Sequence, residues 1–136
     1  MKDMSLEEKV VKYILTRQND LSPFRLSRIL ILSELEYVKK HGKKPLEFYY
    51  VIYPSAFYIE GFSEFLQDIE DLEKVIEEKD SKKRGYFHLK KPCSCEIPED
   101  LKEIIDNILT TTKDLSDEDL NRMVVEREDY RSYIQN

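Results

Sequence analysis

Cys93 and Cys95 are the residues whose type and spacing most directly suggest chemistry. A Cys-x-Cys pair can give two thiolates to one metal ion, and His88 or His41 could complete a set of four ligands. The second cysteine pair that makes a structural zinc site recognisable is missing, so we expect no metal. Ordinary, partly buried thiols are the favoured interpretation, and a disulfide is left open.

The titratable residues form no recognisable catalytic set. His41 suits the C-terminal turn of a helix as a cation, and His88 lies between two apolar residues of a predicted strand. No Gly-x-Ser-x-Gly nucleophile motif accompanies them, and the three glycines form no phosphate-binding loop. We therefore expect no enzyme activity, no catalytic residues and no cofactor.

Aromatic residues are concentrated between residues 48 and 65. Alternate members of this cluster must fill the core, and tyrosines left outside offer a large contact area at a low entropy cost. Residues 57–71 contain no Lys or Arg, so the exposed face of a helix there is acidic. We expect the following residues to contact a protein partner: Tyr49, Tyr53, Tyr58, Glu60, Glu64, Asp68 and Asp71.

Residues 81–95 carry five basic and no acidic side chains, whereas the segments on both sides are acidic. The acidic face over 57–71 argues against reading of the major groove, because DNA carries one negative charge per ~1.7 Å of its axis. The interpretation favoured for the basic side chains is solvated surface charge. If DNA is bound, the expected phosphate contacts are Lys82, Lys83, Arg84, Lys90 and Lys91.

Two helices are predicted in the first third of the chain. Ser5 and Glu8 form a capping box that starts a helix. Ser22 and Pro23 are a typical N-cap and first residue of the next helix, over 22–41. Apolar residues surround most of that second helix, which indicates a central, buried position, and Gly42 suits its C-terminal cap.

The middle and end of the chain contain both helix-like and strand-like patterns of apolar residues. Residues 46–53 suggest a short strand or extended link, and helical spacing predicts a third helix over 55–70. Residues 74–90 predict a hairpin with a polar turn at 80–85. Two more helices are expected within 98–128, the second capped by Ser116.

Three helices followed by a hairpin is the element order of a winged helix. The sequence therefore predicts a mainly α chain with a small β-hairpin, folded as one winged-helix-like domain over 1–136. In this interpretation 22–41 and 55–70 form a helix-turn-helix pair, 74–90 is the wing, and 98–128 holds the C-terminal helices.

Residues 30–37, Gly42, residues 53–55 and residues 115–120 together resemble the SocA-like Panacea family. Its members have a leucine-rich helix, a following glycine, a Gly-Pro-Ser-like helix start and a similar C-terminal segment. Tyr53 stands here where the family has glycine. The resemblance covers about residues 22–130 and implies an antitoxin that neutralises a toxin through protein contact.

Hydrophobic residues make up 40% of the 136 residues, and the net charge is −6. No apolar run approaches the ~20 residues of a membrane span, and the first residues lack the pattern of a signal peptide. We expect a cytoplasmic, non-enzymatic regulatory module that binds a protein, either a toxin-like partner or a second copy in a homodimer. The alternative is a winged-helix transcriptional regulator that contacts DNA through a basic wing.

Overall fold

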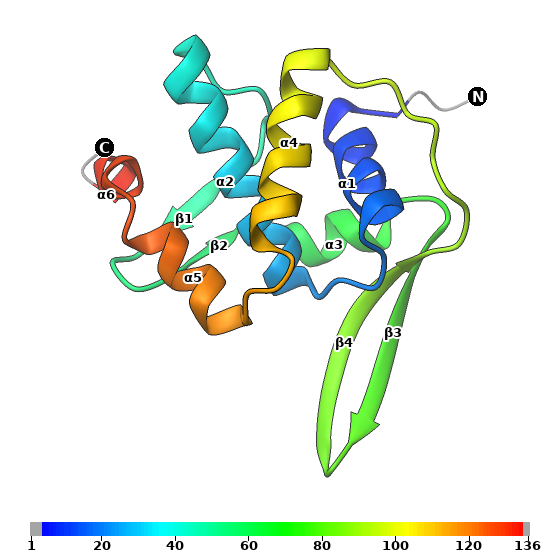
Figure 1. The fold of residues 1–136 in the computed structure, drawn as a ribbon. Coiled ribbons are helices and arrows are strands. Elements are labelled where there is room, and N and C mark those ends of the chain that lie inside the picture. Colours follow the sequence, from blue (N-terminus) through cyan, green and yellow to red (C-terminus); the bar gives the residue numbers. More distant parts are fainter. Residues whose placement is uncertain (1–3, 135–136) are drawn as a thin grey trace. The chain divides into compact units, whose positions relative to one another are not determined.

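The computed structural model describes residues 4–134, over which the chain forms six helices and two antiparallel two-stranded sheets (Figure 1). The elements in chain order are α1 (Leu6–Arg17), α2 (Pro23–His41), β1 (Tyr50–Ile52), β2 (Phe57–Ile59), α3 (Phe62–Gln67), β3 (Leu72–Lys79), β4 (Lys82–Leu89), α4 (Glu99–Thr112), α5 (Asp117–Val125) and α6 (Glu128–Ile134). The prediction of a mainly helical chain with a small hairpin is confirmed, and β1 with β2 adds a second small sheet.

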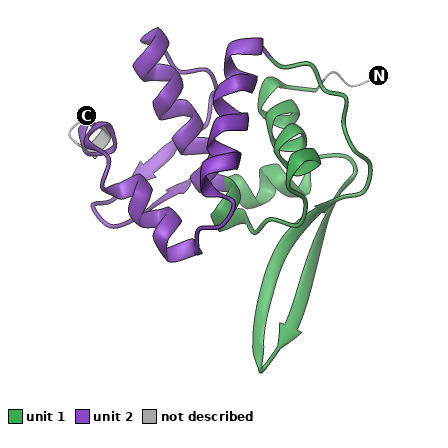
Figure 2. Cartoon of the chain, viewed as in Figure 1, with its two compact units in different colours: residues 1–26, 61–97 green, residues 27–60, 98–136 purple. Residues whose placement is uncertain are grey.

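The residues group into two compact units, coloured separately in Figure 2. Unit 1 comprises residues 1–26 and 61–97, with α1, the first turn of α2, α3 and the β3–β4 hairpin. Unit 2 comprises residues 27–60 and 98–136, with the rest of α2, the β1–β2 hairpin and α4 to α6. The assignment of the whole chain to one winged-helix-like domain stays a prediction.

Local capping signals set the helix starts as expected. The side chains of Ser5, Ser22 and Ser116 each accept a hydrogen bond from a backbone N–H three residues ahead, at 3.1–3.2 Å. α2 ends before Gly42, whose φ of 73° is the left-handed conformation that glycine adopts most easily. Within residues 4–134, no helix combines the length and the apolar character needed to cross a bilayer.

The predicted helix over 55–70 is wrong in its first half. Phe57 and Ile59 are buried while Tyr58 between them is exposed, which is the two-residue alternation of a strand, and this stretch forms β2. Gly61, with a φ of 69°, separates β2 from the six-residue α3. The proposed helix-turn-helix pair therefore has a hairpin between its helices and a much shorter second helix.

The predicted hairpin over 74–90 is confirmed, with a shorter turn than expected. β3 and β4 pair in register from Leu72 opposite Leu89 to Lys79 opposite Lys82, so only Asp80 and Ser81 form the loop. Both loop residues have positive φ, of 53° and 63°, which is the backbone of a type I′ turn. Residues 82–85, expected in the turn, belong to β4.

The type I′ turn makes Ser81 a strained position, because a non-glycine residue in the left-handed region costs about 1 kcal/mol. We predict that Ser81→Gly raises the free energy of unfolding by about 0.5–1 kcal/mol in urea titrations and slows amide exchange in β3 and β4. The control Glu78→Gly, in the extended and exposed part of β3, should lower stability by a similar amount. A loss of stability with Ser81→Gly would contradict the two-residue turn.

Candidate protein-interaction surface

The β1–β2 hairpin in unit 2 has two chemically different faces. Val51 pairs with Tyr58 and Ile52 with Phe57, so neighbouring residues point to opposite sides. On the outer side Tyr49, Tyr53 and Tyr58 are 67%, 54% and 52% exposed. The rings of Tyr53 and Tyr58 stack, with their centroids 6.4 Å apart and their planes at 29°. We call these three residues the tyrosine face; their role as partner contacts stays a prediction.

The inner side of the same hairpin belongs to the core. Phe57 and Ile59 are 4% and 5% exposed, and the ring of Tyr50 meets that of Phe57 edge-on at 5.8 Å. The Tyr50 hydroxyl donates a hydrogen bond to the carboxylate of Glu34, a buried residue of α2. The hairpin therefore has one orientation, in which the tyrosine face points away from α2.

Tyr130 of α6 holds the turn of this hairpin from the inside. It is fully buried, and its hydroxyl lies 2.5 Å from the carbonyl oxygen of Tyr53 and 2.9 Å from that of Ala56. One hydroxyl proton thus serves the two carbonyls that bracket the turn. Burial raises the pKa of Tyr130, and the nearby positive charge of Arg28 partly offsets this effect.

Arg28 of α2 is the charged group at the centre of unit 2. It is 4% exposed, and its guanidinium carbon lies 4.3 Å from the centre of the Phe57 ring. Its Nε and one terminal nitrogen donate to Oδ1 of Asn121, at 3.1 and 2.8 Å. Burial lowers the pKa of Arg28 to about 10, against the opposing effect of Tyr130 and Asp117, so the side chain stays protonated at neutral pH.

Asn121 of α5 connects this charge to the hairpin. Its amide nitrogen donates a hydrogen bond to the backbone carbonyl of Ser55, at 3.0 Å, while its amide oxygen accepts the hydrogen bond from Arg28. Beside this contact lies a groove of about 590 Å³, lined among others by Pro54, Arg122 and Arg131. The turn of the tyrosine face is thus held by Asn121 and borders this groove.

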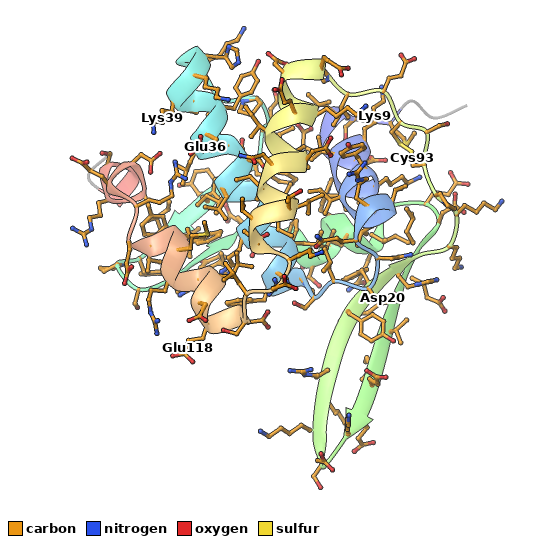
Figure 3. All side chains as sticks on the ribbon, in the orientation of Figure 1. Lys9, Asp20, Glu36, Lys39, Cys93 and Glu118 are labelled. Atoms are coloured by element: carbon orange, nitrogen blue, oxygen red, sulfur yellow. A yellow bond between two sulfur atoms is a disulfide. The ribbon has the colours of Figure 1, made fainter. Side chains whose placement is uncertain are left out.

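Arg127 fixes the start of α6 on α2. Its guanidinium donates to both carboxylate oxygens of Asp129 and to Glu36, all at 2.8 Å, and Figure 3 labels Glu36 on α2. These hydrogen bonds, first of all those with Asp129, raise the pKa of Arg127 and lower the pKa of Asp129. The position of Tyr130, one residue after Asp129, is set by the same contacts.

The acidic residues expected at a partner surface fall into both units. Glu60 belongs to unit 2, is exposed, and donates its backbone N–H to the carbonyl of Tyr49, at 3.0 Å. Glu64, Asp68 and Asp71 belong to unit 1. Glu64 and Asp68 are exposed, whereas Asp71 is half-buried, has a φ of 68° and accepts the N–H of Lys90 at its carbonyl.

The five basic residues proposed for phosphate contact do not form one cluster. Lys82, Lys83 and Arg84 are exposed next to the turn of the β3–β4 hairpin. Lys90 and Lys91 follow the other end of β4, about 25 Å away at ~3.3 Å per strand residue. Arg84 faces Glu77 and Lys83 faces Glu78 across the ladder, so two of the five charges have an acidic neighbour opposite.

Cys93 and Cys95 are joined to each other by a disulfide, so the favoured interpretation of two ordinary thiols is wrong. The histidines considered as their partners have other contacts: Nδ1 of His88 lies 2.6 Å from Asp20, and Nε2 of His41 lies 3.4 Å from Asp100. Among the residues that the structure describes, no group of three or more His, Cys, Asp or Glu side chains is arranged to hold a metal ion.

Arg28, Asn121 and Tyr130 were not among the residues that sequence reasoning selected. Arg28 has one signal, since it directly precedes the apolar run 29–32 of α2. Asn121 has none, because it is an ordinary polar residue 93 positions away from its partner.

Searches against protein-family models, curated proteins and solved structures find no match for this chain.

The Arg28–Asn121 contact yields a stability prediction. Asn121→Ala removes the acceptor of two of the hydrogen bonds of a buried guanidinium and should lower the free energy of unfolding by about 2–3 kcal/mol. Glu118→Ala, on the same helix with an 84% exposed side chain, should change it by less than about 0.5 kcal/mol. Urea titration followed by circular dichroism measures both, and equal small effects would show that Asn121 does not hold Arg28.

Proposed function

We propose that this chain is a non-enzymatic protein-interaction module of the antitoxin type, which binds a protein partner through the tyrosine face. The observation that carries the proposal is the exposure of Tyr49, Tyr53 and Tyr58 on one side of a short, firmly backed hairpin. Tyrosine is enriched in protein interfaces because its ring buries a large area while only two torsions are restricted.

The size of the surface suits the centre of an interface. At 150–250 Å² per aromatic side chain, the exposed parts of the three tyrosines offer roughly 350 Å². A standard interface buries about 800 Å² on each partner, so surrounding residues must supply the rest. Glu60, opposite Tyr49 across the hairpin, and the groove beside Pro54 are polar surfaces of the same unit that adjoin the hairpin.

The acidic residues of this chain favour a partner of positive charge. Glu60, Glu64, Asp68 and Asp71 would attract a basic partner and speed its association, in keeping with the net charge of −6. A toxin with a basic, apolar contact surface has the chemistry that this arrangement favours. The resemblance of residues 22–130 to the Panacea family supports the same assignment, and with it a cytoplasmic location.

The proposed fold is a winged-helix variant. The chain order of α1, α2, α3 and the β3–β4 hairpin corresponds to the three helices and wing of that fold, with the β1–β2 hairpin inserted between the second and third helices. In this variant the inserted hairpin carries the tyrosine face. The contact with the partner therefore uses the insertion rather than the third helix alone.

The partner-binding test uses the tagged full-length chain coexpressed with the product of its neighbouring gene. We predict that Tyr53→Ser combined with Tyr58→Ser weakens the complex about 30-fold or more, as loss of an interface centre does. The control Ile76→Ser removes a side chain that is 63% exposed in the other unit, and should leave affinity unchanged. Normal affinity of a folded double tyrosine variant would disprove the assignment.

Two further experiments separate the parts of the proposal. Reversing the charge at Glu64 and Asp68 should weaken binding mainly at low salt, since exposed charges are screened at higher ionic strength. Sedimentation of the chain alone reports self-association. A homodimer that the double tyrosine variant abolishes would identify a second copy as the occupant of the tyrosine face.

DNA binding by the β3–β4 hairpin is the second candidate, favoured by the exposure of Lys82, Lys83 and Arg84 beside its turn. Electrophoretic titration at two salt concentrations tests it. Replacing the three residues with alanine should reduce the salt dependence of any binding by about 0.9 per lost phosphate contact. No binding by the unmodified chain at low salt removes this candidate, whereas tight sequence-specific binding would place it first.

A further inference from the structure

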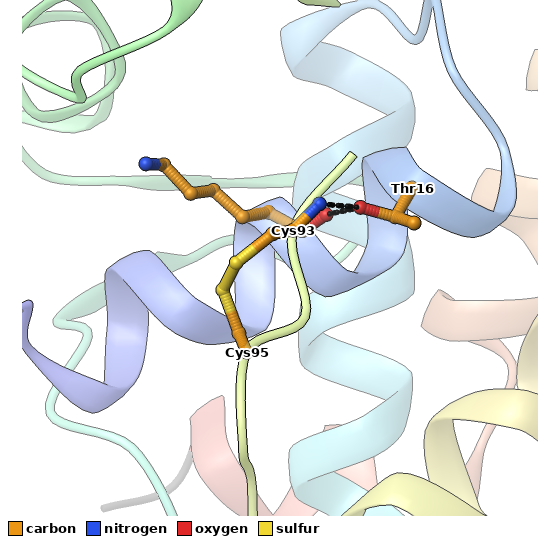
Figure 4. The surroundings of a disulfide bond; sticks show 4 residues. Thr16, Cys93 and Cys95 are labelled. Carbon is orange, nitrogen blue, oxygen red and sulfur yellow. Dashed lines mark hydrogen bonds between the residues drawn. A yellow bond between two sulfur atoms is a disulfide. The ribbon is translucent and has the colours of Figure 1, made fainter. Parts of the chain in front are cut away.

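The segment after β4 carries the two cysteines of the chain, joined to each other across a single residue (Figure 4). Their Cα atoms are 5.2 Å apart, and both side chains are partly exposed. Residues 92–98 form no helix or strand. Water and small solutes therefore reach a disulfide that lies outside regular structure.

This disulfide contributes little to the stability of the fold. A disulfide stabilises a fold mainly by shortening the loops of the unfolded chain, and the gain grows with the number of residues enclosed. Cys93 and Cys95 enclose only Ser94 and connect no two helices or strands. Opening the bond costs the fold little, which is a requirement for a disulfide that opens and closes reversibly.

The backbone of Cys93 is held by a hydrogen bond to α1 in the conformation that the disulfide has. The N–H of Cys93 donates to Oγ1 of Thr16, at 3.0 Å, and that hydroxyl donates to the carbonyl of Lys12, at 2.7 Å, in the last turns of α1 (Figure 4). Both partners belong to unit 1. Because this hydrogen bond favours the backbone conformation of Cys93 that the disulfide requires, it favours closing of the sulfur–sulfur bond.

The local charge suits a thiolate on the N-terminal side. Lys90 and Lys91 precede Cys93, and no acidic residue occurs from 81 to 95, although Glu96 follows Cys95 directly. Positive neighbours stabilise the thiolate, which is the reactive form in exchange. The pair is thus accessible, anchored and placed next to cations.

We propose that Cys93 and Cys95 form a thiol–disulfide exchange site for low-molecular-weight thiols and disulfides of the glutathione class. The site is independent of the tyrosine face and of its proposed partner. Its chemistry is the reversible two-electron conversion between the disulfide and the dithiol.

The exchange has two steps. The thiolate of one glutathione attacks one sulfur of the pair, which forms a mixed disulfide, breaks the Cys93–Cys95 bond and releases the other sulfur as a thiolate that takes up a proton. A second glutathione thiolate attacks the glutathione sulfur of the mixed disulfide and releases the remaining cysteine as a thiol. Two glutathione thiols are oxidised to one disulfide while the protein disulfide is reduced, and the reverse steps reoxidise it.

The experiment equilibrates the full chain with mixtures of reduced and oxidised glutathione, quenches it with acid, alkylates the free thiols and counts them by mass spectrometry. The expected result is complete and reversible conversion between disulfide and dithiol as the ratio of reduced to oxidised glutathione is changed. Urea titration of the two forms should give coincident unfolding midpoints, as for a change that leaves the packed core untouched. A pair that stays reduced in excess glutathione disulfide, or a disulfide that excess glutathione does not open, overturns the proposal.

Variants test the hydrogen bond between Thr16 and Cys93 and the accessibility of each cysteine to glutathione. Thr16→Val removes the acceptor of the Cys93 N–H and should shift the equilibrium about fivefold toward the dithiol, the equivalent of one ordinary hydrogen bond. Thr110→Val removes a hydroxyl of α4 that bonds only its own helix, and should shift nothing. Cys95→Ser and Cys93→Ser leave a single thiol, and at least one of them should form a glutathione adduct. Absence of an adduct on both, or equal shifts with the two threonine variants, contradicts the site.

Discussion

Arg28 places a positive charge inside unit 2, and several neighbouring elements are arranged around it. A buried guanidinium without partners would cost several kcal/mol, whereas bonds to a well-placed acceptor and contact with an aromatic face offset that cost. Asn121 and Ser27 supply acceptors and Phe57 supplies the ring. Because Asn121 comes from α5 and Phe57 from β2, their contacts with Arg28 fix both elements on α2.

The orientation of the β1–β2 hairpin follows from this arrangement. Phe57 must face Arg28, and Tyr130 must reach the carbonyls of Tyr53 and Ala56, so the strand alternation leaves Tyr58 on the outside. The exposed tyrosines are therefore held by buried polar contacts beneath them. A surface prepared in this way loses little conformational entropy on binding, which raises affinity for a given contact area.

Local signals predicted much of the fold. Serine caps at 5, 22 and 116 and the apolar surroundings of α2 depend on residues a few positions apart, and the helices are found where these patterns place them. The apolar spacing over 57–70 suits a helix as well as a strand followed by a short helix. Contacts with α2 and α6 decide between them, and these lie far along the chain, as between Arg28 and Phe57.

In the candidate sites, too, features set by neighbouring residues could be predicted and features set by distant residues could not. The tyrosines could be proposed as contact residues, but their exposure could not be predicted, because 57–59 is a strand where the sequence indicates a helix. Asn121, an acceptor of Arg28, is 93 residues away from it and has no local signature. The pairing of Arg84 with Glu77 depends on the two-residue turn at Asp80 and Ser81, whereas a six-residue turn was expected. The length of the turn decides which charged residues lie opposite each other, and therefore the electrostatic potential of the hairpin surface.

The central claim is that the hairpin held by Arg28 and Tyr130 is the surface that meets the partner. Hydrogen–deuterium exchange of the full chain, alone and in complex with the copurified product of the neighbouring gene, measures this directly. The account predicts slower exchange in peptides covering residues 49–60, with residues 72–89 unchanged. Protection confined to 72–89, with exchange over 49–60 the same in both states, would contradict it.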